Sequence, residues 1–269
     1  MPGDSFRLIR EVPDACVDLV MTDVPYPDMK IHDGTRRIIA SEEWIEWFKP
    51  LAIEIKRVLK PTGSFVTTIN SKKDRGFYFD WVAWMRQTLE FHFVLPHYWV
   101  KKNIIPGSVK RMRFPRDGVD HIAWFGATPR YYANLGAIDN WKKYNPATTT
   151  PTNMIYASTM DDMSYHRAKK KTGIDHTGKY PELIPDLFIQ ILTQPGGTVL
   201  EPFLGTGTTA IVAAKHGREC MAFERNMKNV TLARAAMKEA RKLYNFDDVF
   251  QVLSARKWKL FRQSQAASR

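Results

Sequence analysis

The feature that most restricts the fold of this chain is a strand, a glycine-containing turn, a helix and a second strand within residues 198–224. The apolar run 198–201 predicts a buried strand, and the turn at 205–209 opens a helix that reaches about Lys215. Residues 220–224 predict the next strand. Two strands joined through a helix pair in parallel, so the stretch predicts a parallel α/β sheet.

The N-terminal part repeats this alternation. Residues 17–21 predict a buried strand that stops at a proline-containing loop, and 64–69 and 93–100 predict two more strands. A helix is expected from Ser41, and another over 77–91. The first helix is predicted from large apolar residues at helical spacing: Trp44, Phe48, Ala52, Ile55 and Leu59.

Residues 103–175 interrupt the alternation. They are rich in Pro, Gly, Asn and Thr and contain no long periodic segment, so we expect an insertion with little regular structure. Helices are expected again over 182–192 and 226–244. The predicted organisation is one domain in two halves, 1–102 and 176–269, with the insertion 103–175 between them.

The positive charge of the chain is regional. The net charge is +12, and residues 97–175 contain 13 Lys and Arg against six Asp and Glu, while 225–269 contain 11 against three. A segregated positive field predicts a polyanionic partner such as nucleic acid. In the central block the cations alternate with aromatic residues, which suits base stacking together with phosphate contacts.

Composition excludes several classes of protein. Two cysteines, Cys16 and Cys220, supply neither a disulfide scaffold nor a zinc cluster, and no metal site is expected. The sequence contains no apolar run of transmembrane length and no secretory h-region at its start. We therefore expect a cytoplasmic protein without a membrane partner, associated with the nucleoid if the source is prokaryotic.

The loop after the strand 198–201 has the features of a nucleotide site. Glu201 ends the strand, and Gly205 and Gly207 let the backbone approach a ligand closely. The loop lacks the lysine of a phosphate-binding P-loop. Glu224 ends the next strand, where a carboxylate can bind a ribose diol. Together these residues indicate an adenosine-containing cofactor.

A second candidate site is the loop Asp23-Val24-Pro25-Tyr26. An exocyclic amino group becomes nucleophilic when acceptors around its hydrogens reduce its conjugation with the ring. The Asp23 carboxylate and a main-chain carbonyl are suitable acceptors, and the Tyr26 ring can stack on a base. Four consecutive residues therefore offer the groups that amine methylation needs.

At this point the sequence resembles the β-class amino DNA methyltransferases, which use S-adenosyl-L-methionine. The resemblance covers nearly the whole chain and keeps the order of that class, with the catalytic loop before the cofactor loop. It is carried by segments similar to the family's motifs: Gly3-Asp4 with 17–26, 59–64, 99–103, 176–181, 196–209 and 217–224. It implies a Rossmann-like, mixed but mostly parallel sheet with helices on both faces and an irregular target-recognition insertion.

The resemblance also implies roles. Asp23, the carbonyl of Val24, Pro25 and Tyr26 would hold the target amine of a base flipped out of duplex DNA. The cofactor would be bound by Asp4, His176, Lys179, Glu201, Phe203, Gly205, Thr206, Gly207, Thr208 and Glu224. DNA contacts are expected from Lys101, Lys102, Arg111, Arg113, Arg116, Lys169 and Lys170. A homodimer and a cognate restriction endonuclease are both compatible with this family.

Three positions depart from the family pattern: Val24 replaces a proline, Glu201 replaces an aspartate, and Tyr180 stands where the family has a lysine. Asp at position 23, where cytosine-N4 enzymes of the class carry Ser, favours methylation of adenine N6. Cytosine N4 is the alternative target. The departures leave a second alternative, a catalytically inactive homologue that binds DNA.

Overall fold

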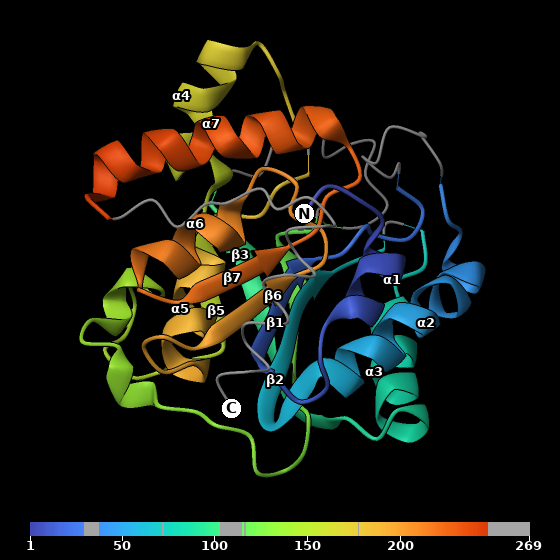
Figure 1. Ribbon diagram of the computed structural model, residues 1–269. Coiled ribbons are helices and arrows are strands. Elements are labelled where there is room, and N and C mark those ends of the chain that lie inside the picture. The colour runs from blue at the N-terminus through green and yellow to red at the C-terminus, as the bar shows by residue number, and fades with distance from the viewer. Residues whose placement is uncertain (30–37, 72, 103–114, 116, 177, 247–269) are drawn as a thin grey trace.

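The computed structural model describes residues 1–29, 38–71, 73–102, 115, 117–176 and 178–246 (Figure 1). In these residues a seven-stranded sheet has the order β5-β3-β4-β2-β1-β6-β7. The strands are β1 (Val17–Asp23), β2 (Leu59–Ile69), β3 (His92–Lys101), β4 (Val119–Gly126), β5 (Met154–Ala157), β6 (Thr198–Glu201) and β7 (Glu219–Ala222). Strand β4 is antiparallel to β2 and β3, and the other neighbours pair in parallel. The predicted mixed, mostly parallel sheet is confirmed.

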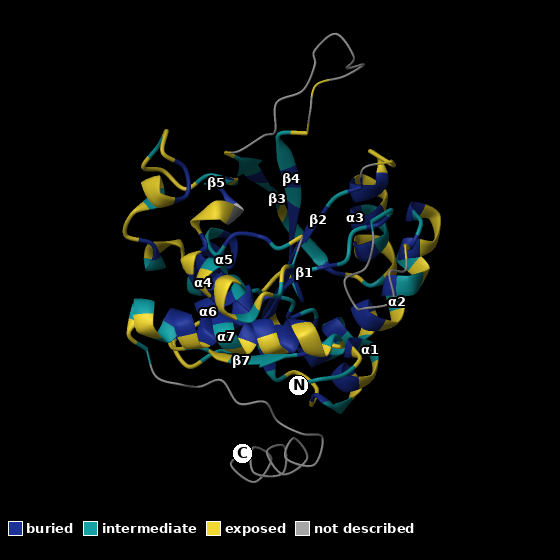
Figure 2. Ribbon diagram, turned by 90° about the horizontal axis from the view of Figure 1, so that it is seen from above, coloured by how far each residue is buried: buried dark blue, intermediate teal, exposed yellow. Residues whose placement is uncertain are grey.

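Helices cover both faces of this sheet (Figure 2). They are α1 (Ser5–Leu8), α2 (Ser41–Val58), α3 (Phe77–Thr88), α4 (Met163–Thr172), α5 (Leu183–Leu192), α6 (Thr208–Lys215) and α7 (Met227–Tyr244). Helices α1 to α3 lie on one side and α4 to α6 on the other, while α7 runs across beside β7 and packs against α4 and α6. The predicted apolar face of α2 is buried, with Trp44, Phe48 and Ile55 inaccessible to solvent. Phe188 of α5 is equally buried in the opposite core.

The segment 103–175 contains more regular structure than its composition indicates. Strand β4 lies between β2 and β3, β5 pairs with β3, and α4 packs against α7. Ile122 and Phe125 of β4 point into opposite cores, so both faces of the strand are buried. A strand of this kind is a continuous apolar run without alternation, which is why periodicity does not identify it. The expectation of little regular structure was wrong for these residues.

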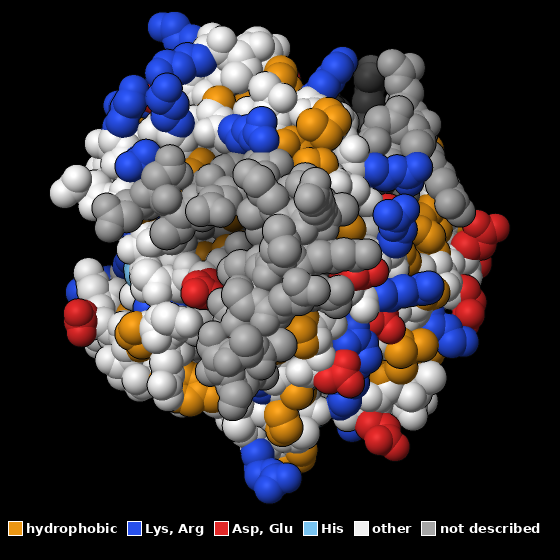
Figure 3. Space-filling view, in the orientation of Figure 1, with side chains coloured by type: hydrophobic (Ala, Val, Ile, Leu, Met, Phe, Trp, Pro, Cys, Tyr) orange, Lys and Arg blue, Asp and Glu red, His pale blue; other side chains and the backbone are white. Residues whose placement is uncertain are grey.

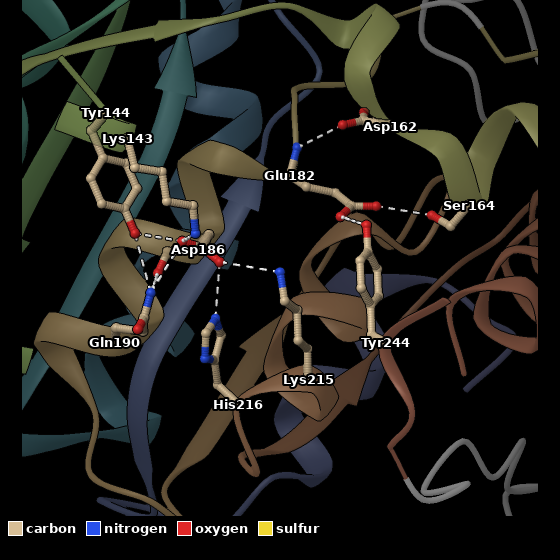
Figure 4. A network of polar contacts seen from close by, with 10 residues as sticks. All are labelled: Lys143, Tyr144, Asp162, Ser164, Glu182, Asp186, Gln190, Lys215, His216 and Tyr244. Carbon is tan, nitrogen blue, oxygen red and sulfur yellow. Dashed lines mark hydrogen bonds and ion pairs between the residues drawn. The ribbon is translucent and has the colours of Figure 1, made fainter. Parts of the chain in front are cut away.

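A buried carboxylate joins this segment to the helices (Figure 4). Asp186 of α5 accepts hydrogen bonds from Lys143 (2.6 Å), Gln190 (3.1 Å) and the hydroxyl of Tyr144. The His216 ring, just after α6, lies 3.0 Å from the same carboxylate. Burial alone would raise the pKa of Asp186, but these hydrogen bonds and charges hold it well below its usual range. The network fixes the turn at 141–144 against α5 and α6.

None of the described helices has the length and apolar character needed to cross a membrane. The described residues also contain no group of three or more His, Cys, Asp or Glu side chains arranged to hold a metal ion.

Candidate active site

The two predicted loops leave the sheet from neighbouring strands. β1 ends at Asp23 and β6 ends at Glu201, and the two strands pair in parallel, with Val20 opposite Leu200. The hydroxyl of Thr22 donates a hydrogen bond to the Glu201 carboxylate and so links the two strand ends. Parallel strands present their carboxyl ends at one edge of a sheet, which brings the loops together.

The loop after β1 is held by contacts at both ends. The hydroxyl of Thr68, which lies opposite Asp23 in β2, donates to the Asp23 carboxylate. The indole N–H of Trp44 donates to the carbonyl of Pro25 at 2.8 Å. Val24 is buried in the core, whereas Tyr26 is partly exposed beside it. A buried valine can therefore stand where the family has proline, because the following Pro25 and the Trp44 contact still restrain the loop.

The Asp23 carboxyl group has an unusual acidity. Burial raises its pKa to about 8, the charges of Asp120 and Glu201 add to the increase, and hydrogen bonds from Thr68 and Tyr26 oppose it. Burial also raises the pKa of Tyr26 well above its ordinary value, so its hydroxyl stays protonated. The site thus contains a carboxyl group that changes its protonation state near neutral pH.

Below the second loop, a chain of hydroxyl groups surrounds Glu201. Thr209 donates to its carboxylate at 2.5 Å, and the N–H of Phe203 donates at 2.9 Å. Tyr180 is buried, and its hydroxyl is hydrogen-bonded to that of Thr209. Burial raises the pKa of Glu201 to about 7 despite these donors. Two departures from the family pattern, Glu201 and Tyr180, are therefore connected through one threonine.

The loop itself closes on Glu224. The N–H of Gly205 donates to one carboxylate oxygen at 2.9 Å, and the N–H of Asn226 donates to the other at 2.6 Å. Gly205 and Gly207 have φ of +52° and +86°, a region that favours glycine. A Cβ at Gly207 would also lie 3.1 Å from the side chain of Ala233 in α7. The side chain of Asn229 also forms a hydrogen bond with the Glu224 carboxylate.

Asp4 lies near Glu224 because the N-terminal segment is hydrogen-bonded to the backbone of Glu224. The N–H of Gly3 donates to the carbonyl of Glu224 at 2.8 Å, and the Asp4 carboxylate caps α1 by accepting from Phe6 at 2.9 Å. Phe203 is stacked near Trp47, with ring centroids 6.3 Å apart. Acceptors for a ribose diol, a further carboxylate and an aromatic ring are the groups that an adenosine moiety requires. The residues present therefore fit the adenosine part of S-adenosyl-L-methionine.

The motif at 176–181 lies across from the glycine loop. A Cβ on Gly205 would lie 3.5 Å from Nε2 of His176, so this imidazole borders the loop. Lys179 instead forms a buried ion pair with Asp162, and its ammonium group lies 4.4 Å from the ring of Tyr165. Thr206 and Thr208 are buried, and their hydroxyl oxygens are 3.0 Å apart. The structure thus groups most of the predicted cofactor residues but gives Lys179 a partner within the protein.

The predicted DNA contacts lie in different places. Lys101 forms an ion pair with Asp120, Lys169 forms one with Asp175 at 2.7 Å, and Lys102 and Lys170 are exposed. Arg111, Arg113 and Arg116 lie outside the described residues. Lys and Arg side chains gather over α4 and the C-terminal part of α7 (Figure 3). They include the following exposed residues: Arg167, Lys170, Lys171, Lys238 and Lys242.

Sequence reasoning missed several residues that contact the site. Thr68 and Asp120 touch or face the Asp23 carboxylate and are remote from it in sequence, whereas Thr209, which binds Glu201, lies only eight residues from it in the predicted loop 205–209. A signal existed for Thr209, which belongs to that loop, and for Thr68, which lies at the end of a predicted strand. The pairing of strands decides the contact of Asp120.

Comparison with known proteins gives a consistent result. Residues 17–235 match a family described as DNA methylase, of the N6 and N4 methyltransferases. The Type II methyltransferase M.PvuII of Proteus hauseri is 26% identical over 264 residues, covering 82% of this chain and 78% of the relative. The Type II methyltransferase M.ScaI of Streptomyces caespitosus is 24% identical over 234 residues, covering 80% of this chain and 73% of the relative.

Solved structures agree on the fold. A PvuII DNA methyltransferase described as cytosine-N4-specific superposes with a TM-score of 0.71 at 22% identity, covering 91% of this chain and 92% of the other. The complex of M1.HpyAVI with SAM has a TM-score of 0.60 at 17% identity, covering 88% and 97%. The fold found here is therefore that of known methyltransferase structures.

Proposed function

Because the chain belongs to the DNA methylase family that matches most of its length, we propose that it methylates the N6 amino group of adenine in duplex DNA. S-adenosyl-L-methionine is the methyl donor of the family. The observation that supports the proposal most is the juxtaposition of Asp23 and Tyr26, after β1, with the Glu201 loop after the adjacent β6. The amine and the methyl donor would then meet at one edge of the sheet.

Each half of the proposed site has a defined task. The carboxylate of Asp23 and the carbonyl of Val24 accept the two hydrogens of the amino group, and Tyr26 stacks on the flipped base. Asp23 accepts the proton that the amine loses after methylation. Glu224 binds the ribose hydroxyls, and Phe203 and Asp4 contact the adenine of the cofactor. The donor supplies an electrophilic methyl group, so the protein's part is positioning and electrostatic stabilisation.

The recognition element and the partners complete the proposal. We assign target recognition to residues 103–175 and the Lys and Arg side chains within them. The relatives are named Type II methyltransferases, which supports a restriction-modification context in the cytoplasm. Cytosine N4 is the second candidate target, since the PvuII enzyme of similar fold is cytosine-N4-specific.

Tyr26→Ala is expected to reduce methylation by about 5- to 150-fold, because stacking on a base contributes roughly 1–3 kcal/mol. The measurement uses S-adenosyl-L-methionine and duplex DNA of mixed sequence, followed by digestion to nucleosides and mass spectrometry. N6-methyladenine supports the proposal, and N4-methylcytosine supports the second candidate. Tyr132→Ala is the matched control, because the backbone of Tyr132 is bonded to Thr62 at the opposite edge of the sheet. No methylated nucleoside with the wild type would contradict both candidates.

The rate of methyl transfer is expected to rise with pH up to about 8. The pKa of Asp23 is raised to about 8, so the carboxyl group is protonated below that pH and cannot accept a proton from the amine. At saturating cofactor and DNA, kcat should fall about tenfold per pH unit below about 7 and level off above 8. A kcat that stays constant between pH 6 and 8 would contradict this role for Asp23.

A further inference from the structure

A row of polar side chains continues from Asp23 across the sheet. Lys101, at the end of β3, lies two residues from Trp99. In the same way, Asp120 in β4 lies two residues from Ile122, and Thr68 in β2 lies two residues from Val66. The side chains of Trp99, Ile122 and Val66 all point into the core beneath α5. Side chains two residues apart share a face of a strand, so the polar row lies on that same face.

The same argument places Asp23. It follows Met21, which is buried in the core beneath α5. Because the strands are ordered β3-β4-β2-β1, the sequence of side chains across the edge is Lys101, Asp120, Thr68 and Asp23.

Asp120 is the centre of this row outside the catalytic loop. Its side chain is only 8% exposed, and its Oδ1 accepts hydrogen bonds from Nζ of Lys101 at 2.8 Å and from Nδ2 of Asn70 at 2.7 Å. Lys101 also lies 5.5 Å from the ring of Trp99, which restricts its position further. A buried carboxylate with two fixed donors has a defined location and a charge that solvent screens poorly.

Several groups face Asp23 from the elements packed around it. Thr68 and Tyr26 are its hydrogen-bond partners, and Asp120 and Glu201 are the negative charges that act on it. Tyr180 is also close enough to interact electrostatically with Asp23. Glu201 is bound to Thr22 and Thr209, which are neutral. Asp120 and Glu201 differ in their described partners, because the partners of Asp120 include a cation, Lys101, and those of Glu201 do not.

We propose that Lys101 and Asp120, fixed by Asn70, are positioning residues of the methyl-transfer site: Asp120 strengthens the negative field at Asp23, and Lys101 limits it. This proposal rests on the proposed function of Asp23 as the proton acceptor. Lys101 was expected from the sequence to contact a DNA phosphate. In the proposal its charge also affects the proton affinity of Asp23. Because the two charges have opposite signs, their removal is expected to shift the pKa of Asp23 in opposite directions.

The test uses Asp120→Asn and Lys101→Met in the full-length protein. Asp120→Asn leaves Lys101 uncompensated, so the pKa of Asp23 and the acid limb of the kcat profile should move down by roughly one pH unit. Lys101→Met leaves Asp120 uncompensated, so both should move up by a similar amount. The double variant should lie between the single variants. Lys101→Arg keeps the charge and should keep the profile of the wild type.

Titration of the Asp23 carboxyl carbon by NMR measures the same quantity without catalysis. Its resonance is assigned from the spectrum of Asp23→Asn, and thermal melting shows whether each variant is folded. Lys60→Met is the matched control, because Lys60 pairs with Asp18 at 2.8 Å at the opposite end of β2 and β1. It should leave the titration of Asp23 unchanged.

Opposite shifts for the two single variants support the proposal, and shifts in one direction or none overturn it. If the wild type methylates no DNA, the proposed function fails, while the NMR titration still decides the relation between these three residues.

Discussion

Asp23→Asn is expected to lower kcat for methyl transfer by about 10²–10³-fold while leaving the affinity for S-adenosyl-L-methionine within about twofold of the wild type. The amide has almost the same shape as the carboxylate, but it cannot take a proton from the amine, and it presents one acceptor instead of two. Thr68 can still donate to the remaining carbonyl oxygen. Single-turnover rates and cofactor binding by calorimetry separate the two effects. An equal loss of both would indicate damage to the fold instead.

Asp23→Asn is expected to lower kcat but to increase the stability of the folded protein. The pKa of Asp23 is about 8 in the folded protein, whereas the ordinary pKa of an aspartate is about 3.8, so the unfolded chain ionises first. Burial of the ionised group therefore costs the wild type stability as the pH rises from about 4 to 8. The melting temperature of Asp23→Asn should exceed that of the wild type by a margin that grows over this range and is constant above it. Asp18→Asn, at the other end of β1, should show neither this margin nor a loss of kcat.

Glu224→Gln is expected to weaken binding of S-adenosyl-L-methionine by about 100-fold, which corresponds to roughly 3 kcal/mol. Both oxygens of the Glu224 carboxylate accept backbone N–H groups, one from Gly205 and one from Asn226. An amide can replace only one of these acceptors, because its NH₂ group would face a second donor. The cost therefore includes an unsatisfied buried N–H and a displaced glycine loop, in addition to the lost charge at the ribose.

Glu219→Gln is the matched control for this experiment. Glu219 is exposed at the start of β7, at the far end of the strand that leads to Glu224. It should bind the cofactor like the wild type. Dissociation constants from calorimetry, with kcat measured at saturating cofactor, distinguish loss of binding from loss of chemistry. Unchanged affinity in Glu224→Gln would place the cofactor elsewhere.

The strands and helices with strong local patterns were predictable from the sequence. The strand 198–201 has the predicted bounds, and the helix expected over 226–244 is Met227–Tyr244. In α2, apolar residues recur at helical spacing. Only a helix places Trp44, Phe48 and Ile55 on the same face, so the pattern predicts one structure. β4 was not predictable in this way, because its burial on both faces removes the alternation that marks a strand.

The site was predictable only as far as it depends on strand ends. Asp23 and Glu201 were both expected at the carboxyl edge of a parallel sheet, and the structure brings them together there. The partners of charged side chains were not predictable, because the sheet order decides them. Lys101 meets Asp120 only because β4 returns beside β3, and Lys179 meets Asp162 only because α4 lies near the start of α5.

The antiparallel strand β4 has a consequence for how such proteins can change during evolution. The chain leaves the sheet after Lys101 and re-enters it at Val119 on the adjacent strand, and the N–H of Lys101 is bonded to the carbonyl of Gly118 at 2.9 Å. Both junctions are therefore fixed by the sheet, close to the methyl-transfer site. If target recognition lies between these junctions, as proposed above, changes of sequence there can alter the specificity while the two strands that hold the segment stay the same.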